Sequence, residues 1–261
     1  MSGAGMHHIV HEAGGSNASP LAGTRVWLVG ASSGIGAAVA AELVRRGARV
    51  AITARRRDRL EEVAGGRMTV VPGDATDADG IAAAASTASA ALGGLDMVIW
   101  CAGYWKQVDA ARWDAAEFRR HIEVNLLGLS NVLDAVLPTM VDQRRGHFVG
   151  VASVAGFRGL PGAEAYGATK AAQINLLEAL RVSLRRHGIR VTTVAPGFVR
   201  TEMTDVNSFP MPFLIDPDRA ARSIADGLER GRMEIVFPWQ MAIAAKIARL
   251  LPVRLWAALR R

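Results

Sequence analysis

Short apolar runs alternate with longer stretches of helical periodicity, and this alternation constrains the fold more than any other feature of the sequence. The apolar runs cover residues 26–29, 50–53, 69–71, 97–100, 147–151, 191–194 and 235–237. Between them we expect helices near residues 35–47, 58–64, 77–92, 114–140, 164–187 and 217–230. Short strands without polar alternation, separated by helices, are typical of a parallel sheet that helices cover on both faces. The sequence therefore predicts a doubly wound α/β fold.

We expect a single domain, because no internal repeat or linker interrupts this alternation over the 261 residues. The domain should extend from residue 23 to residue 237. Residues 1–22 are rich in Gly, Ser, Ala and His without an apolar period, which indicates a flexible leader. The leader histidines have no acidic or cysteine partner nearby, so we predict no metal site. Residues 238–261 form a separate C-terminal appendage.

Composition argues against several classes of function. The formal net charge is +7, but the basic residues are scattered and form no long run with interleaved aromatic residues, so we expect no nucleic-acid binding. The single cysteine, Cys101, excludes an intramolecular disulfide and fits a cytoplasmic protein. Residues 1–20 lack the apolar stretch of a signal peptide. The run 235–245 is about half as long as a membrane span, which needs roughly 20 residues.

A glycine-rich turn joins the first predicted strand to the first predicted helix. It reads Gly30-Ala31-Ser32-Ser33-Gly34-Ile35-Gly36. Glycines permit a tight turn and close approach of the backbone to a phosphate, and a helix N-terminus supplies free N–H groups and a favourable dipole. Ligands bind at this junction in doubly wound folds, so we predict a nucleotide site, with a purely structural turn as the alternative.

The GxxxGxG spacing of this turn resembles the phosphate loop of the short-chain dehydrogenase/reductase family, and the resemblance extends from about residue 24 to residue 237. It implies a Rossmann-type domain with a parallel β-sheet flanked by helices. By resemblance, Asp74 would contact the adenine and Thr201 the nicotinamide carboxamide. Trp100 and Cys101 stand where the family carries two asparagines, which puts the local hydrogen bonds in question. The implied cofactor site comprises Gly30, Ser32, Ser33, Gly34, Ile35, Gly36, Arg55, Asp74, Ala102, Gly103, Tyr166, Lys170, Pro196, Gly197, Val199 and Thr201.

The end of the second strand predicts which nicotinamide cofactor binds. A ribose with free hydroxyls is usually held there by a carboxylate, whereas a 2′-phosphate needs a cation and no carboxylate. Ala54 occupies the position of the acidic residue in NAD-preferring relatives, and Arg55 follows it. We therefore predict NADP(H), although the arginines from Arg55 to Arg57 could instead cap a solvated helix start.

A tyrosine and a lysine four residues apart form the predicted catalytic pair. On a helix, residues i and i+4 share a face, so Lys170 should lie beside Tyr166. A nearby cation favours the phenolate and should lower the pKa of the tyrosine from its usual value near 10. Such a tyrosine can exchange a proton with a substrate oxygen during hydride transfer.

The family resemblance adds two residues to this pair. Ser153, which follows the strand at 147–151, would hydrogen-bond the substrate oxygen and Tyr166. Asn125 matches the family asparagine that completes a water-mediated proton relay to Lys170, and Lys170 would also hold the nicotinamide ribose. Each residue is common by itself, but their joint order after a phosphate loop predicts a catalytic site.

We therefore expect an NADP(H)-dependent oxidoreductase that transfers hydride between the nicotinamide and a carbonyl or secondary alcohol. One alternative is a non-catalytic NADP-binding sensor or scaffold, which predicts erosion of a catalytic position; none is eroded. Another is the longer epimerase/dehydratase branch of the same superfamily, for whose larger substrate domain residues 201–261 leave little room. The resemblance also implies a homo-oligomer formed through the helices near 114–140 and 164–187.

Two further segments bear on the substrate and on partners. The stretch 207–214 lies where the family's mobile lid begins, and its apolar side chains suit a lipophilic small molecule. Residues 239–261 include Trp239 and Trp256. If this segment were one continuous helix, its cations would share an arc of roughly 140°, although Pro252 should kink it. This segment could lie on an anionic membrane, making the protein peripheral, or pack against the core or another subunit. The cations are Lys246, Arg249, Arg254, Arg260 and Arg261.

Overall fold

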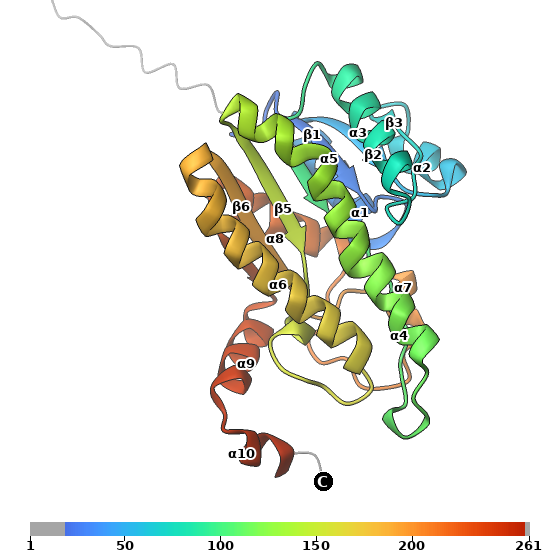
Figure 1. Cartoon of the computed structure of the whole chain (residues 1–261), viewed down its shortest axis with the longest axis vertical. Coiled ribbons are helices and arrows are strands. Elements are labelled where there is room, and N and C mark those ends of the chain that lie inside the picture. The colour runs from blue at the N-terminus through green and yellow to red at the C-terminus, as the bar shows by residue number, and fades with distance from the viewer. Residues whose placement is uncertain (1–18, 259–261) are drawn as a thin grey trace, which may run out of the picture.

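A seven-stranded parallel sheet forms the centre of the molecule in the computed structural model, which describes residues 19–258 (Figure 1). The strand order is β3-β2-β1-β4-β5-β6-β7. The strands are β1 (Arg25–Val29), β2 (Arg49–Thr53), β3 (Thr69–Val70), β4 (Met97–Trp100), β5 (Gly146–Val151), β6 (Ile189–Pro196) and β7 (Glu234–Phe237). The order reverses beside β1, so the carboxyl ends of β1 and β4 border a crevice where ligands bind in such sheets. The predicted doubly wound fold is confirmed.

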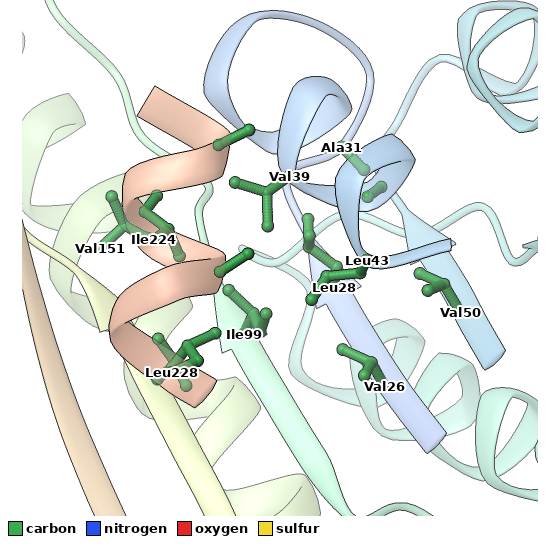
Figure 2. Packing of buried hydrophobic residues seen from close by; sticks show 14 of the residues in the cluster. Val26, Leu28, Ala31, Val39, Leu43, Val50, Ile99, Val151, Ile224 and Leu228 are labelled. Carbon is green, nitrogen blue, oxygen red and sulfur yellow. The ribbon is translucent and has the colours of Figure 1, made fainter. Parts of the chain in front are cut away.

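Helices cover both faces of the sheet, because the strands are apolar on both sides. One face carries α1 (Gly34–Arg45), α2 (Arg57–Ala64) and α8 (Pro217–Glu229). The other face carries α3 (Ala78–Leu92), α5 (Gly128–Gln143) and α6 (Glu164–Leu184). On the first face, Figure 2 shows Leu28 of β1 and Ile99 of β4 beneath side chains of α1 and α8. This packing holds the turn between β1 and α1 in a fixed place above the sheet.

The predicted helix near 114–140 is one helical stretch, Ala115–Gln143, with an irregular turn inside it. It consists of α4 (Ala115–Ile122), a π-helical turn (Glu123–Leu127) and α5. By length and composition alone this stretch could cross a membrane. Its side chains Leu129, Val132 and Val136 are buried in the core of the second face, so it serves as a covering helix of the sheet. Asn125 lies in the π-helical turn, and such turns are frequent at functional sites.

The structure refines both ends of the expected domain. Residues 19–22 belong to the folded part, because Leu21 is buried in the core and Ser19 hydrogen-bonds Glu229. After β7, the appendage forms α9 (Trp239–Leu250) and α10 (Val253–Ala258), and the chain breaks helical geometry at Leu251 before Pro252. Residues 1–18, with the leader histidines, and residues 259–261, with Arg260 and Arg261, lie outside the described part of the chain.

Candidate active site

A cleft of about 380 Å³ opens at the carboxyl ends of the central strands. The residues predicted for the cofactor site come from separate stretches of sequence, and the structure brings all of them to this cleft. They are Gly30, Ser32, Ser33, Gly34, Ile35, Gly36, Arg55, Asp74, Ala102, Gly103, Tyr166, Lys170, Pro196, Gly197, Val199 and Thr201. Ser153 also lines the cleft, whereas Asn125 is fully buried behind it. Their individual roles stay predictions.

The turn after β1 is packed so closely against neighbouring backbone that two of its positions accept only glycine. A Cβ atom at Gly30 would overlap the backbone of Ala102, and one at Gly36 would overlap the carbonyl oxygen of Gly30. Gly30 has a φ of 96°, a conformation that side chains rarely adopt. The side chain of Ser33 does not cap α1, which leaves the first amide groups of this helix available to an anion.

Two arginines form a basic rim where β2 ends. Arg55 and Arg56 both line the cleft and are exposed. Arg56 Nη2 lies 3.4 Å from Ser32 Oγ in the turn after β1 and 3.4 Å from Glu202 Oε2 in the short helix α7 (Glu202–Asp205). The sequence singled out Arg55 alone, because nothing in a run of three arginines shows which side chains reach the cleft.

Tyr166 and Lys170 lie near the start of α6, and Ser153 follows the end of β5. Lys170 Nζ is 5.5 Å from the centre of the Tyr166 ring. Burial raises the pKa of Tyr166 to about 12, while a hydrogen bond with Ser153 acts in the opposite direction. The expectation that Lys170 brings this pKa below its usual value is not met in this arrangement, because burial is the largest influence on it. At neutral pH, Tyr166 holds its proton.

Lys170 is buried and is held by two oxygen acceptors. Its Nζ donates to Val151 O and to Gln173 Oε1, each at 3.0 Å. Burial lowers the pKa of Lys170 to about 8, so its charge is only weakly stabilised inside the protein. Gln173 Nε2 in turn donates to the backbone carbonyl of Asn125. A continuous hydrogen-bonded chain thus joins Lys170, Gln173 and Asn125.

Gln173 was not recognised from the sequence, although a signal for it exists. It follows Lys170 by three residues, so both side chains share one face of α6. A fully buried glutamine needs partners for both its oxygen and its nitrogen, and it finds them in Lys170 and Asn125. Its position relative to Asn125, 48 residues earlier in the chain, depends on the tertiary fold.

Asn125 also fixes the loop that follows β4. Its Oδ1 accepts from Tyr104 N at 2.6 Å, and its Nδ2 donates to Tyr104 O and to Thr169 Oγ1, each at 3.0 Å. Cys101, which stands where the family has asparagine, keeps the sheet ladder through its N–H to Val29 O at 2.8 Å. Burial raises the pKa of the Cys101 thiol to about 12, so this cysteine is not a reactive thiolate.

The segment after β6 borders the cleft with residues 201–204 and then continues into the expected lid residues, 207–214. Thr201 is the N-cap of α7, and its backbone N–H donates to Thr204 Oγ1 at 2.9 Å. Farther along, Asn207 Oδ1 accepts from the indole N–H of Trp105 at 2.9 Å. The Trp105 ring meets the Tyr166 ring edge to face, with 5.2 Å between their centres. Trp105 therefore connects the lid segment to the predicted catalytic tyrosine.

A family model described as short chain dehydrogenase matches residues 24–209. An oxidoreductase of Myxococcus xanthus (strain DK1622) is 42% identical over 240 residues, covering 90% of this chain and 95% of that protein. An oxidoreductase of Staphylococcus aureus (strain N315) is 33% identical over 201 residues, covering 76% of this chain and 87% of that protein.

Solved structures resemble the fold as well. A short-chain dehydrogenase of Burkholderia cenocepacia J2315 in complex with NADP superposes with a TM-score of 0.81 at 28% identity, and the match covers 92% of this chain and 99% of that one. A short-chain dehydrogenase of Streptomyces avermitilis superposes with a TM-score of 0.76 at 27% identity, covering 85% of this chain and 92% of that one.

Proposed function

The chain belongs to the short-chain dehydrogenase family of oxidoreductases, and we propose that it is an NADP(H)-dependent reductase of carbonyl groups on lipophilic small molecules. The observation that carries this proposal is the position of the catalytic residues. Ser153, Tyr166 and Lys170 line the same cleft as the glycine-rich turn after β1. A nucleotide bound at that turn and a substrate beside Tyr166 would therefore meet in one place.

The residues of the cleft fit a dinucleotide cofactor. The glycine turn lines the cleft, and α1 offers its first amide groups there to a pyrophosphate. Arg55 and Arg56 offer cations to a 2′-phosphate at the end of β2, with no carboxylate at position 54 to repel it. The relative from Burkholderia cenocepacia, solved with NADP, supports the same choice of cofactor.

The protein's own residues supply the proton chemistry of the reaction. The bound nicotinamide would supply or accept hydride at the substrate carbon. In the reductive direction, the Tyr166 hydroxyl gives its proton to the carbonyl oxygen, while Ser153 orients that oxygen by a hydrogen bond. The tyrosine is then reprotonated through Lys170, whose ammonium lies 5.5 Å from the Tyr166 ring centre. Asn125 and Gln173 hold Lys170 in place through their hydrogen-bonded chain.

We take reduction as the direction of the reaction, because cellular NADPH pools generally drive NADP(H)-dependent enzymes that way. A protonated Tyr166 can act as the acid in this step. Met203, which lines the cleft, and Trp105, which meets the Tyr166 ring, support a lipophilic substrate, since Met and aromatic side chains adapt to acyl chains and rings.

Two finer points of the proposal concern assembly and location. The exposed apolar side chains Leu127 and Val182, on the predicted oligomer helices, support a homo-oligomer. A cytoplasmic location is consistent with Cys101 being a free thiol. The competing proposal is a non-catalytic NADP sensor, but Asn125, Ser153, Tyr166 and Lys170 are all present, and nothing favours the loss of activity.

A panel of carbonyl compounds and alcohols tests the proposal. Long-chain acyl, steroid-like and quinone carbonyls are offered with NADPH or NADH, and cofactor absorbance is followed. We expect NADPH-dependent reduction of at least one lipophilic carbonyl, with a clear preference over NADH. NADPH binding by calorimetry without turnover of any compound would instead support the sensor. Equal use of both cofactors would contradict the NADP(H) proposal.

A further inference from the structure

Helix α9 is apolar on two opposite faces, and only one of them packs against the protein. On the inner face, Ala245 is buried and Met241 lies against Gly197 and Pro238. The outer face consists of large apolar side chains that are 50% to 84% exposed. They are Trp239, Ile243, Ile247 and Leu250. A helix that is apolar all round normally has both faces covered.

The exposed side chains form one continuous stripe. At about 100° per residue, the four positions fall within an arc of roughly 80° on α9, opposite Ala245. Helix α10 also exposes two apolar side chains, Val253 and Leu255, which are 74% and 55% exposed. Monomeric proteins rarely expose apolar side chains contiguously, and such patches mark interaction sites.

The charged side chains of α9 and α10 themselves are all positive. From Ile235 to the end of the chain the sequence contains no Asp or Glu. Lys246 borders the stripe on α9, Arg249 lies on the flank between the stripe and the inner face, and Arg254 lies on α10; all three are exposed. Lys246 Nζ is 3.6 Å from Glu234 Oε2, an exposed pair with little energetic weight. The outer face therefore combines apolar insertion with a positive border.

The position of α9 and α10 links this surface to the active site. Arg158 Nη2 donates to Leu251 O, and Trp256 Nε1 donates to Gly159 O, both at 3.1 Å. Arg158 and Gly159 belong to the loop between Ser153 and Tyr166. Figure 1 shows α9 and α10 at the same end of the molecule as α4 and α7, below the carboxyl ends of the strands.

We propose that the outer face docks the protein on an anionic lipid membrane. Trp239, Ile243, Ile247 and Leu250 would enter the interface, while Arg249 and Arg254 would contact anionic headgroups. The charge pattern favours lipid over a second copy of this chain. A two-fold contact would place the same patch against itself, so cations would face cations without any acidic partner within the segment.

Membrane docking would set the active-site end of the molecule toward the bilayer. The loop 157–163, on which α10 rests, would then lie close to the lipid surface together with the lid segment after β6. A lipophilic substrate could pass between bilayer and cleft without crossing water. The docking surface itself does not depend on the proposed function, since vesicle binding can be measured without any substrate.

Flotation with lipid vesicles tests the docking of the full chain. Vesicles of phosphatidylcholine alone are compared with vesicles that also contain phosphatidylglycerol, at low and high salt. We expect flotation with the anionic vesicles that weakens at high salt. The variant Ile247→Asn/Leu250→Asn should lose binding by about 100-fold or more, because two inserted side chains are removed. The variant Arg249→Gln/Arg254→Gln should lose roughly 10- to 30-fold.

Met233→Asn is the matched control, because Met233 is 65% exposed in the turn before β7 and belongs neither to the outer face nor to the predicted oligomer helices. It should float like the parent. Thermal melts check that each variant folds. If Ile247→Asn/Leu250→Asn does not fold, Trp239→Ser serves as the second test. Absence of parent binding to anionic vesicles would overturn the proposal, as would unchanged binding by the apolar variants. If those variants instead dissociate an oligomer in sedimentation while the parent binds no lipid, the outer face is a contact between copies.

Discussion

Lys170 owes its behaviour to two opposing influences on its ammonium group. Burial removes the group from water and lowers its pKa to about 8, while the oxygens of Val151 and Gln173 accept its protons. A hydrogen bond to a charged group contributes about 1.5–3 kcal/mol, so each acceptor matters to the protonation of Lys170. The state of the lysine near neutral pH therefore depends on Gln173, a residue outside the predicted catalytic set.

Gln173→Met should remove one acceptor from Lys170 while keeping the side-chain volume. The pKa of Lys170 then falls further, so the alkaline limb of the kcat/KM profile for reduction should move to lower pH by about one unit or more. The matched control is Gln240→Met, a second glutamine with a buried amide oxygen, located in α9. A pH profile identical to that of the parent would show that Gln173 does not position the lysine.

Arg55 is expected to carry much of the preference for NADP(H). Arg55→Ala should lower kcat/KM with NADPH by roughly 10- to 100-fold and leave kcat/KM with NADH nearly unchanged, because one charge-assisted phosphate contact is lost. Arg57→Ala is the control, since Arg57 pairs with Glu61 at 2.8 Å on the outside of α2. Parallel losses with both cofactors would show that Arg55 does not read the 2′-phosphate.

Among the elements, the lid segment is tied to the loop after β4 by one specific bond, from Trp105 to Asn207. Phe209 adds a second contact against Phe198, with 6.1 Å between ring centres. These side-chain contacts add to the backbone hydrogen bonds that join Ile215 to residues 198 and 200 at the end of the segment. A lid that must open for substrate should have few ties of this kind, because local opening is easiest where contacts are few.

Removal of the lid bond should act on substrate binding more than on proton transfer. Trp105→Phe and Asn207→Ala should each raise KM for a lipophilic carbonyl several-fold, since one hydrogen bond contributes about 1 kcal/mol. The double variant should have a KM no higher than that of the more affected single variant, because both changes remove the same contact. Steady-state kinetics of the parent, the two single variants and the double variant form a double-mutant cycle. Fully additive effects on KM would mean that the two residues act separately.

At the level of elements, the sequence predicts the sheet well because short apolar runs between helices have few other solutions. It predicts the break at Pro252 for a similar reason, since proline cannot continue the helix. The π-helical turn around Asn125 was not foreseen, because it adds a residue to a helix without any change in composition. Gln173 and Trp105 were missed because their partners lie far away in sequence. The raised pKa of Tyr166 depends on burial, which the Tyr–Lys spacing does not report.

For the whole molecule, the buried Lys170 makes stability depend on pH. Its folded pKa of about 8 lies below the unfolded value of 10.5, so the unfolded chain binds more protons between these values. Stability should therefore rise as pH increases through this window. From pH 8 to pH 9 the parent should gain roughly 1 kcal/mol relative to Lys170→Met. Urea unfolding of both proteins at the two pH values measures this gain. If the difference in unfolding free energy between the two proteins is the same at pH 8 and pH 9, the pKa of Lys170 is not lowered by burial.

The central claim for the whole molecule is that Tyr166 supplies the proton for carbonyl reduction. Only two tyrosines occur in the chain, and Tyr104 offers a matched control because it lies near the cleft but points to Glu117 and Arg120. The most direct measurement is kcat/KM for NADPH-dependent reduction in the parent, Tyr166→Phe and Tyr104→Phe, together with NADPH affinity. We predict that Tyr166→Phe loses about 100-fold or more in kcat/KM with nearly unchanged NADPH affinity, while Tyr104→Phe keeps most activity. Near-normal reduction by Tyr166→Phe would contradict the catalytic assignment.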